Sequence, residues 1–195
     1  AAFVVPPAII DSHRASYSAC EPSQIWMLSG LHNRAISSTQ ASSLVFMVVP
    51  PGMPSLVIAG PQTEHLVQQI RRLGLQDSVY ITGVVSQHTL VALYQKAVAL
   101  CLPSLYEGFG LPVLEAMACG APVITSNTTA FPEIFGDAAL LIDPAKPEDI
   151  TRAMQKIIEN NSLANTLRER GLKKARELSW EKSAVKTEAV FKGIT

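Results

Sequence analysis

Strand and helix patterns alternate along the chain from residue 55 onward, and this alternation constrains the fold more than any other feature. Short apolar runs predict buried strands at 56–60, 79–82, 98–103, 122–126 and 139–143. Apolar spacing and boundary residues predict helices at 64–73, 87–97, 111–119, 147–160, 162–178 and 180–192. Because strands that alternate with helices pair in parallel, we predict an α/β fold, a Rossmann-like parallel sheet with helices on both faces.

Polar residues and a proline predict where several helices begin. Ser86, Ser162 and Ser179 stand in N-cap positions, and Pro147 suits the first turn of a helix. Ligands of parallel sheets bind beyond the carboxyl ends of the strands, where loops lead into helices. The stretch EGFG, which follows the predicted strand at 98–103, occupies such a loop.

The region before residue 55 has a less regular pattern. Residues 25–29, IWMLS, predict a strand, and we expect a helix within 31–53 to connect it to the strand at 56–60. Two features oppose that helix: SSTQASS has poor helix propensity, and LVFMVV is an unbroken apolar run without helical spacing. Residues 11–24 are polar and irregular, which is typical of an exposed connection.

The composition narrows the class of protein. The 195 residues can hold one sizeable core, and 16 basic residues balance 16 acidic residues. A net charge of zero gives no general attraction to nucleic acids, so we expect no nucleic-acid partner. No signal peptide is predicted, and prolines interrupt the apolar stretch 43–60. We therefore expect a cytoplasmic location, with peripheral membrane association left open for the full-length protein.

The cysteines and histidines do not predict a metal site. Cys20, Cys101 and Cys119 are widely spaced, and the last two lie in apolar runs, which favours buried thiols over a disulfide framework. The four histidines make no ligand-spaced cluster with cysteine. We expect neither a metal ion nor a cofactor.

The segment EGFGLPVLE at 107–115 places two glutamates around a glycine turn that opens a helix. The start of a helix presents unpaired backbone N–H groups and about half a positive charge, which suits an anion. Gly108 and Gly110 allow the backbone to approach a ligand closely, and Pro112 suits the first helical turn. Because helix side chains lean towards the N-terminus, Glu115 is expected to point back to the mouth of the loop.

A carboxylate beside an anion site is explained if it accepts hydrogen bonds from hydroxyl groups next to a phosphate. Glu115 is then expected to bind the hydroxyls of a ribose, and Glu107 those of a second polyol. A diphosphate between two sugars is a nucleotide sugar, which is the ligand we predict. Two other interpretations remain: a capping and solvated pair of acids, with a stabilisation of about 0.3–1 kcal/mol, or the carboxylate pair of a glycosidase. A glycosidase gives no reason for an amide-rich helix start between the acids.

The stretch SLYEGFGLPVLEAMACGAPVITSN resembles the E-x7-E segment of the GT-B retaining glycosyltransferases of family 4, the glycosyl transferases group 1. Further segments resemble the C-terminal, donor-binding domain of that family in the same order: SLVIAGP, VYITGVVSQHTLVALYQKA, FPEIFGDAALLIDP and LSWEKSA. The resemblance covers 55–192 strongly and 1–30 loosely, where VVPPAI resembles the hinge strand that enters that domain.

The resemblance implies a metal-independent transferase that moves a hexose from a nucleotide sugar to an acceptor with retention at the anomeric carbon. The donor is expected to be of the GDP-mannose or UDP-glucose type. Glu107 matches the catalytic glutamate that contacts the transferred sugar, and Glu115 matches the glutamate on the ribose diol. The other matching donor-binding positions are Gly108, Phe109, Gly110 and Leu111 in the loop, and Val84 near the base.

Two departures from the family pattern bear on the donor site. We expect the N-terminal acceptor domain to be missing from this sequence. Leu31 and Ala35 replace the arginine and lysine that the family places after the first strand, which leaves Arg34 as our candidate for diphosphate binding. A helix end supplies about +0.5 charge against a diphosphate of about −2, so the loss of both cations weakens binding severely. Either Arg34 substitutes for them or this segment is degenerate.

We divide the chain into a hinge strand and connection at 1–24, a nucleotide-sugar-binding domain at 25–178 and a C-terminal helix at 179–195. In GT-B enzymes the last helix packs back across the hinge, so here it is expected to expose apolar surface and favour self-association. The leading hypothesis is the donor-binding half of a glycosyltransferase, inactive in transfer by itself. A non-catalytic nucleotide-sugar-binding or scaffold module is the alternative. A dinucleotide-dependent enzyme is disfavoured because GxGxxG is not completed.

Overall fold

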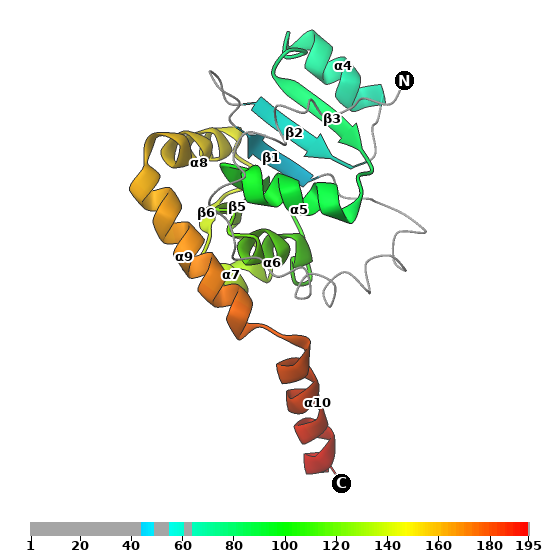
Figure 1. Cartoon of the computed structure of the whole chain (residues 1–195), viewed down its shortest axis with the longest axis vertical. Coiled ribbons are helices and arrows are strands. Elements are labelled where there is room, and N and C mark those ends of the chain that lie inside the picture. The colour runs from blue at the N-terminus through cyan, green and yellow to red at the C-terminus, as the bar shows by residue number, and fades with distance from the viewer. Residues whose placement is uncertain (1–43, 49–54, 61–63, 195) are drawn as a thin grey trace.

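A mixed six-stranded sheet forms the centre of the computed structural model, which describes residues 44–48, 55–60 and 64–194. Its strand order is β3-β2-β1-β4-β5-β6 (Figure 1). The strands are β1 (Leu44–Val48), β2 (Ser55–Ala59), β3 (Val79–Gly83), β4 (Ala99–Leu102), β5 (Val123–Ser126) and β6 (Leu140–Ile142). β2 pairs in parallel with β3, and β5 pairs in parallel with both β4 and β6. The α/β fold and the strands predicted from residue 55 onward are confirmed.

Strand β1 corrects the prediction for residues 31–53, in which we expected a helix. Leu44–Val48 pairs antiparallel with both β2 and β4, so the sheet is not entirely parallel. The reason lies in the unbroken apolar run of this segment. An amphipathic helix needs polar residues for its solvent face, whereas a central strand can be apolar on both faces. Residues 31–43 and 49–53, and the predicted strand at 25–29, lie outside the described residues.

Helices cover both faces of the sheet (Figure 1). Along the described chain they are α4 (Glu64–Arg72), α5 (Gln87–Lys96), α6 (Leu111–Ala118), α7 (Phe131–Phe135), α8 (Pro147–Glu159), α9 (Asn161–Glu177) and α10 (Trp180–Ile194). All except α7 lie where the sequence predicted them. No helix was predicted for the stretch FPEIF, which forms the short helix α7 because Pro132 suits a first helical turn.

The predicted N-caps are confirmed for two helices and wrong for one. The hydroxyl oxygens of Ser86 and Ser179 accept hydrogen bonds from the backbone N–H groups three residues later, both at 3.2 Å. Helix α9 uses Asn160 in place of Ser162. The side-chain oxygen of Asn160 accepts from the backbone N–H of Leu163 at 2.9 Å, and asparagine is as good an N-cap as serine. Ser162 lies one residue inside the helix, where its hydroxyl cannot take this role.

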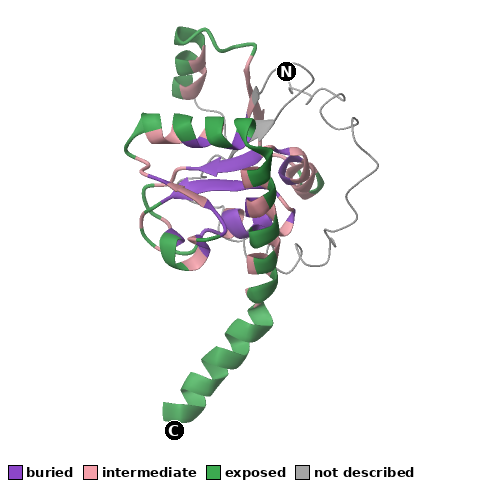
Figure 2. Cartoon of the chain, turned by 90° about the vertical axis from the view of Figure 1, so that its left-hand side faces the viewer, coloured by how far each residue is buried: buried purple, intermediate pink, exposed green. Residues whose placement is uncertain are grey.

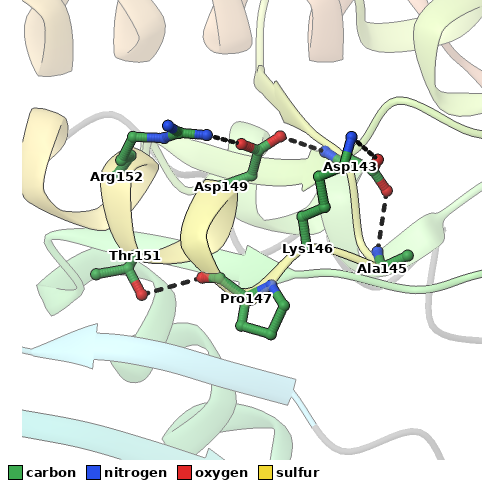
Figure 3. Close-up of polar contacts among 7 residues, drawn as sticks. All are labelled: Asp143, Ala145, Lys146, Pro147, Asp149, Thr151 and Arg152. Carbon is green, nitrogen blue, oxygen red and sulfur yellow. Dashed lines mark hydrogen bonds and ion pairs between the residues drawn. The ribbon is translucent and has the colours of Figure 1, made fainter.

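A network of short-range contacts fixes the connection from β6 to α8 (Figure 3). Asp143 accepts hydrogen bonds from the backbone N–H of Ala145 at 3.0 Å and pairs with the Lys146 ammonium at 2.9 Å. The Lys146 contact, followed by the Ala145 N–H, lowers the pKa of the Asp143 carboxyl. Asp149, in the first turn of α8, accepts from the backbone N–H of Asp143 at 3.4 Å and pairs with Arg152. These contacts fix the turn that leads into α8, and the predicted start of the helix at Pro147 is confirmed.

Two apolar cores lie on opposite faces of the sheet, as the alternation along β4 shows. Leu100 and Leu102 belong to a core covered by α5, α6 and α7, whereas Ala99 and Cys101 belong to one covered by α8 and α9. Strands β4 and β5 are buried along their whole length (Figure 2). Cys101 and Cys119 are buried free thiols, as the sequence predicted, and burial raises the pKa of Cys101 to about 12.

Helix α10 extends away from the sheet, and all of its described residues are exposed (Figures 1 and 2). The helix predicted for 180–192 is confirmed, and Trp180, Val185 and Phe191 expose apolar surface as expected. Self-association through this surface stays a prediction. In the part of the chain that the structure describes, no helix has the length and apolarity needed to cross a membrane.

Candidate functional site

The carboxyl ends of the parallel strands meet at one edge of the sheet, and the loops that follow them lie at this edge. Backbone hydrogen bonds join neighbouring strand ends there. Gly60 donates to the carbonyl of Gly83 at 3.0 Å, and Asn127 donates to the carbonyl of Ile142 at 2.7 Å. The loop 103–110, between β4 and α6, lies at the same edge. The predicted position of EGFG is therefore confirmed.

Two hydroxyl groups, one at the end of β5 and one in the turn after it, hold this loop in place. The hydroxyl of Ser126 donates to the carbonyl of Ser104 at 2.6 Å, and the hydroxyl of Thr128 donates to the carbonyl of Leu105 at 3.3 Å. Both donors belong to a strand end and turn more than twenty residues further along the chain. The first half of the loop is thus tied to the neighbouring strand, so its conformation does not depend on local sequence alone.

Glu107 is fixed by one contact to its backbone and one to its side chain. Its backbone N–H donates to the hydroxyl oxygen of Thr129 at 3.4 Å. Its carboxylate oxygen Oε1 accepts from the hydroxyl of Ser104 at 3.0 Å. Thr129 has a φ of +54°, which a β-branched residue rarely adopts, so the turn after β5 carries backbone strain next to Glu107. The carboxylate is partly exposed and can accept further hydrogen bonds from a ligand.

Gly110 joins the loop to helix α6 in a conformation that only glycine fits. Its φ is +93°, and a Cβ placed on it lies 2.3 Å from a ring carbon of the fully buried Phe131. Helix α6 begins at Leu111, with Pro112 in its first turn, as predicted. The first N–H groups of a helix have no intrahelical acceptor, so the start of α6 presents donors and the positive end of the helix dipole to the loop.

Glu115 lies in the second turn of α6 and is only 7% exposed. Its carboxylate oxygen Oε2 accepts a hydrogen bond at 3.0 Å from the hydroxyl of Tyr94, which comes from α5 and is 1% exposed. Burial, and then the Glu115 carboxylate, raise the pKa of Tyr94 well above its ordinary value, so the phenol stays protonated and acts as the donor. A surface glutamate that only caps a helix needs no such partner. The solvated-face interpretation therefore does not describe Glu115.

The other residues predicted to bind the donor do not all lie near Glu107 and Glu115. Gly108 and Phe109 lie in the same loop, and the Phe109 ring packs edge-on against Phe135 with centroids 6.1 Å apart. Val84 is 87% exposed and follows β3 at the same edge, but two strands, β2 and β1, separate β3 from β4. Arg34 lies outside the described residues.

Three residues around the site were not identified as functional from the sequence. Phe131 supports Gly110, Thr129 holds the backbone of Glu107, and Tyr94 holds the carboxylate of Glu115. Tyr94 had a detectable signal, because it places a polar hydroxyl on the apolar face of its helix. Phe131 and Thr129 had none, since their roles depend on contacts between distant segments. Within residues 44–48, 55–60 and 64–194, no group of three or more His, Cys, Asp and Glu side chains could hold a metal ion.

Comparison with protein families gives a match over more than half of the chain. Residues 53–174 match the family model described as "Glycosyl transferases group 1". Among curated proteins, the O-antigen chain mannosyltransferase B of Escherichia coli is 37% identical over 133 residues, which cover 68% of this chain and 35% of that protein. The chain spans about a third or less of the length of the curated relatives it matches.

Comparison with solved structures gives the same family of folds. The sucrose-phosphate synthase of Thermosynechococcus elongatus superposes with a TM-score of 0.63 at 26% identity, covering 71% of this chain and 38% of that one. The C-terminal domain of the group 1 glycosyl transferase LpcC of Francisella tularensis superposes with a TM-score of 0.53 at 26% identity. The superposition covers 58% of this chain and 60% of that one. These neighbours are GT-B glycosyltransferases, and the second of them is a C-terminal domain solved by itself.

Proposed function

Since this chain belongs to the glycosyl transferases group 1 family, we propose that it is the donor-binding part of a retaining, metal-independent hexosyltransferase of family 4. The reaction moves a hexose from a nucleotide sugar to an acceptor hydroxyl. The bond from the anomeric carbon to the diphosphate oxygen breaks, and a bond to the acceptor oxygen forms on the same face of the sugar. The observation that carries the proposal is the pair of glutamates placed on either side of the start of α6.

Each part of the donor has a counterpart at the edge of the sheet. The diphosphate is placed at the start of α6, where the helix dipole favours negative charge and the amides of Phe109, Gly110 and Leu111 are its proposed donors. Glu115 accepts hydrogen bonds from the ribose diol. Glu107 contacts the transferred sugar, and Val84 lies beside the base.

Glu107 is the catalytic residue in this scheme because its carboxylate is partly exposed in the loop that leads into α6. Positive charge develops at the anomeric carbon as the bond to the diphosphate breaks, and a fixed carboxylate stabilises that charge more than it stabilises the ground state. Its contacts with Ser104 and Thr129 support this role, since a preorganised group needs no reorganisation during the reaction.

The negative charge of the diphosphate exceeds what a helix end can balance. A helix start provides about +0.5 charge, so a cation is expected beside the leaving group. Arg34 is our candidate for that cation. Because this assignment rests on the sequence alone, we treat it as a separate hypothesis: Arg34→Ala weakens nucleoside diphosphate binding more strongly at low than at high ionic strength.

The acceptor and the exact donor require more than this chain. The chain spans about a third or less of its curated relatives, so we propose that an acceptor domain completes the enzyme and that this part is inactive in transfer by itself. A mannosyltransferase and a sucrose-phosphate synthase are both similar to the chain, so family membership leaves the transferred sugar open. We propose a donor of the GDP-mannose or UDP-glucose type, and a cytoplasmic location with peripheral membrane association of the full-length enzyme.

Calorimetric titration tests this function directly. The chain is titrated with UDP-glucose, GDP-mannose and ADP-glucose in buffer with EDTA, and we expect one of the three to bind clearly more tightly than the others. Chelation of metal ions should not change its affinity. Absence of saturable binding for all three, or binding that requires a divalent cation, overturns the proposal.

A non-catalytic nucleotide-sugar-binding or scaffold module is the second candidate, because Leu31 and Ala35 replace the two expected cations. This module still binds the nucleotide sugar. The two candidates differ in the full-length protein: the enzyme hydrolyses or transfers the bound sugar and loses that activity in Glu107→Ala, whereas the module shows no turnover in either form.

A further inference from the structure

We infer that Tyr94 is a positioning residue for the donor site, and that its hydroxyl orients the Glu115 carboxylate towards the ribose diol. The inference rests on the proposed function, because it assigns a role to Tyr94 through the ligand that Glu115 binds. Tyr94 itself touches neither the sugar nor the phosphate. It acts on the ligand only through the conformation of Glu115.

The contact joins two side chains that are both buried and come from different helices. Tyr94 lies near the end of α5, and Glu115 lies in the second turn of α6. Their oxygen atoms are 3.0 Å apart, which is a normal hydrogen-bond distance. Tyr94 is 1% exposed, so its ring has little freedom to follow the carboxylate if that side chain rotates.

Packing alone does not explain a tyrosine at this position. Its neighbours in the same core include the apolar residues Leu93, Ala97 and Met117, which a phenylalanine ring of nearly the same volume could pack against. A hydroxyl buried in such surroundings is unfavourable unless it forms a hydrogen bond. The Glu115 carboxylate provides the acceptor, and a hydrogen bond to a charged group is stronger than a neutral one.

The geometry gives the hydroxyl a directional effect on the ligand site. α6 begins at the carboxyl edge of the sheet, and a helix side chain leans towards the N-terminus of its helix, so Glu115 points back towards the loop. Tyr94 reaches Oε2 from the side of the core. With that oxygen held, rotation of the carboxylate away from the loop breaks a buried hydrogen bond. Glu115 is therefore preorganised to accept from two adjacent hydroxyls.

The test compares a nucleoside diphosphate with its 2′-deoxy counterpart, because the difference in affinity isolates the contact to the diol. The full chain and the variants Tyr94→Phe, Glu115→Leu and Tyr94→Phe/Glu115→Leu are titrated with UDP, GDP and their 2′-deoxy forms. Tyr80→Phe is the matched control: Tyr80 also donates to an oxygen, the Asp77 carbonyl at 3.4 Å, but outside the site.

We expect the wild type and the control to prefer the ribose form by about tenfold. Glu115→Leu should abolish the preference, and Tyr94→Phe should reduce it to about two- to threefold without changing affinity for the 2′-deoxy form. The double variant should match Glu115→Leu, since Tyr94 acts only through the carboxylate. A purely structural role of Tyr94 lowers both affinities equally and leaves the preference intact, which overturns the inference.

Two further outcomes separate this inference from the function it rests on. If the wild type binds no nucleoside diphosphate, both fail. If the wild type binds and Glu115→Leu loses the ribose preference while Tyr94→Phe keeps it, only the inference fails. Should Tyr94→Phe not fold, the double variant decides, because it removes the Glu115 carboxylate together with the Tyr94 hydroxyl. Recovery of the folded state then supports the pairing, and continued unfolding overturns it.

Discussion

The start of α6 and the whole of α10 are both helical segments that the sequence predicted, but they differ in what surrounds them. Two residues that shape the start of α6 depend on distant segments: the buried Phe131 leaves no room for a Cβ at Gly110, and Glu115 accepts a hydrogen bond from Tyr94. Helix α10 has no buried residue, and its apolar side chains face solvent. A helical pattern therefore shows where a helix forms, whereas the contacts around it show whether the helix positions a site or awaits a partner.

The strongest way to break the order around α6 is to add one carbon atom to Gly110. Gly110→Ala places a Cβ 2.3 Å from Phe131 and forces a left-handed φ on an L-residue, so the cost should be about 2–4 kcal/mol. We expect a marked fall in melting temperature and loss of nucleotide binding, measured by calorimetry.

Gly108→Ala is the stability control for Gly110→Ala. The same loop places no atom within 4 Å of a Cβ at Gly108, and its φ lies outside the left-handed range. Its unfolding free energy should stay within about 0.5 kcal/mol of the wild type. Equal destabilisation by both substitutions contradicts the described loop conformation.

Much of this contrast was predictable from the sequence, because strands, helices and the EGFG turn depend on local patterns. The start of α6 at Leu111 follows from glycine and proline positions and apolar spacing, whereas the exposure of Phe191 was expected from the family resemblance. The apolar run of β1 was predicted wrongly because the alternation of strands and helices required a connecting helix within 31–53, whereas the short, unbroken run itself fits a strand. The antiparallel direction of β1 had no local signal, since it depends on pairing with both β2 and β4.

The two glutamates were identified from their spacing, but their different surroundings were not. Glu115 is buried against Tyr94 and Glu107 is partly exposed beside Ser104, although both read as acids near a helix start. The difference arises from residues at least twenty positions away for Glu115 and from a local hydroxyl for Glu107. Sequence patterns with short periods cannot reveal the first kind of contact.

The next largest effect is a difference between Glu115→Ala and Glu107→Ala in which ligand each variant binds more weakly. Glu115→Ala should weaken binding of a free nucleoside diphosphate and of the nucleotide sugar alike, by about ten- to a hundredfold or roughly 1.5–3 kcal/mol. Glu107→Ala should leave the free diphosphate nearly unchanged and, in a full-length enzyme, reduce turnover. Calorimetry with both ligands measures the pattern.

Glu148→Ala is the matched control for these variants, since Glu148 is an exposed acid in the first turn of another helix, α8. It should alter neither ligand affinity. Identical behaviour of Glu107→Ala and Glu115→Ala towards both ligands removes the assignment of separate roles, even though the fold is unchanged.

The next prediction concerns the exposed apolar face of helix α10. Trp180, Ala184 and Phe191 line one shallow groove along it, and we expect this face to drive self-association at high protein concentration. Trp180→Glu/Phe191→Glu should weaken the association at least tenfold, about 1.4 kcal/mol, in sedimentation experiments. Because α10 buries nothing, the melting temperature of the sheet should not change.

Lys186→Glu controls for the charge of the α10 variant. It changes the net charge of the chain by the same two units, on a residue outside the groove. Its association should remain close to that of the wild type. A wild-type chain that stays monomeric at millimolar concentration rules out this role of α10.

The smallest expected effect concerns Thr129, where strain and a hydrogen bond oppose each other. Its φ of +54° is unfavourable for a β-branched residue, whereas its hydroxyl accepts from the Glu107 N–H at 3.4 Å. Thr129→Ala removes the hydroxyl and keeps most of the strain, so it should destabilise the chain by about 0.5 kcal/mol, the low end for a long, exposed hydrogen bond. Thr129→Gly removes both, and it should be about 0.5–1 kcal/mol more stable than Thr129→Ala. Both variants should reduce affinity for the nucleotide sugar two- to threefold and leave free diphosphate binding unchanged. The reason is that only the backbone N–H of Glu107 loses a hydrogen bond. If Thr129→Gly is the less stable of the two variants, the backbone of the turn after β5 is not strained. Thr129 then does not belong to the residues that distinguish the ordered site at α6 from the exposed helix α10.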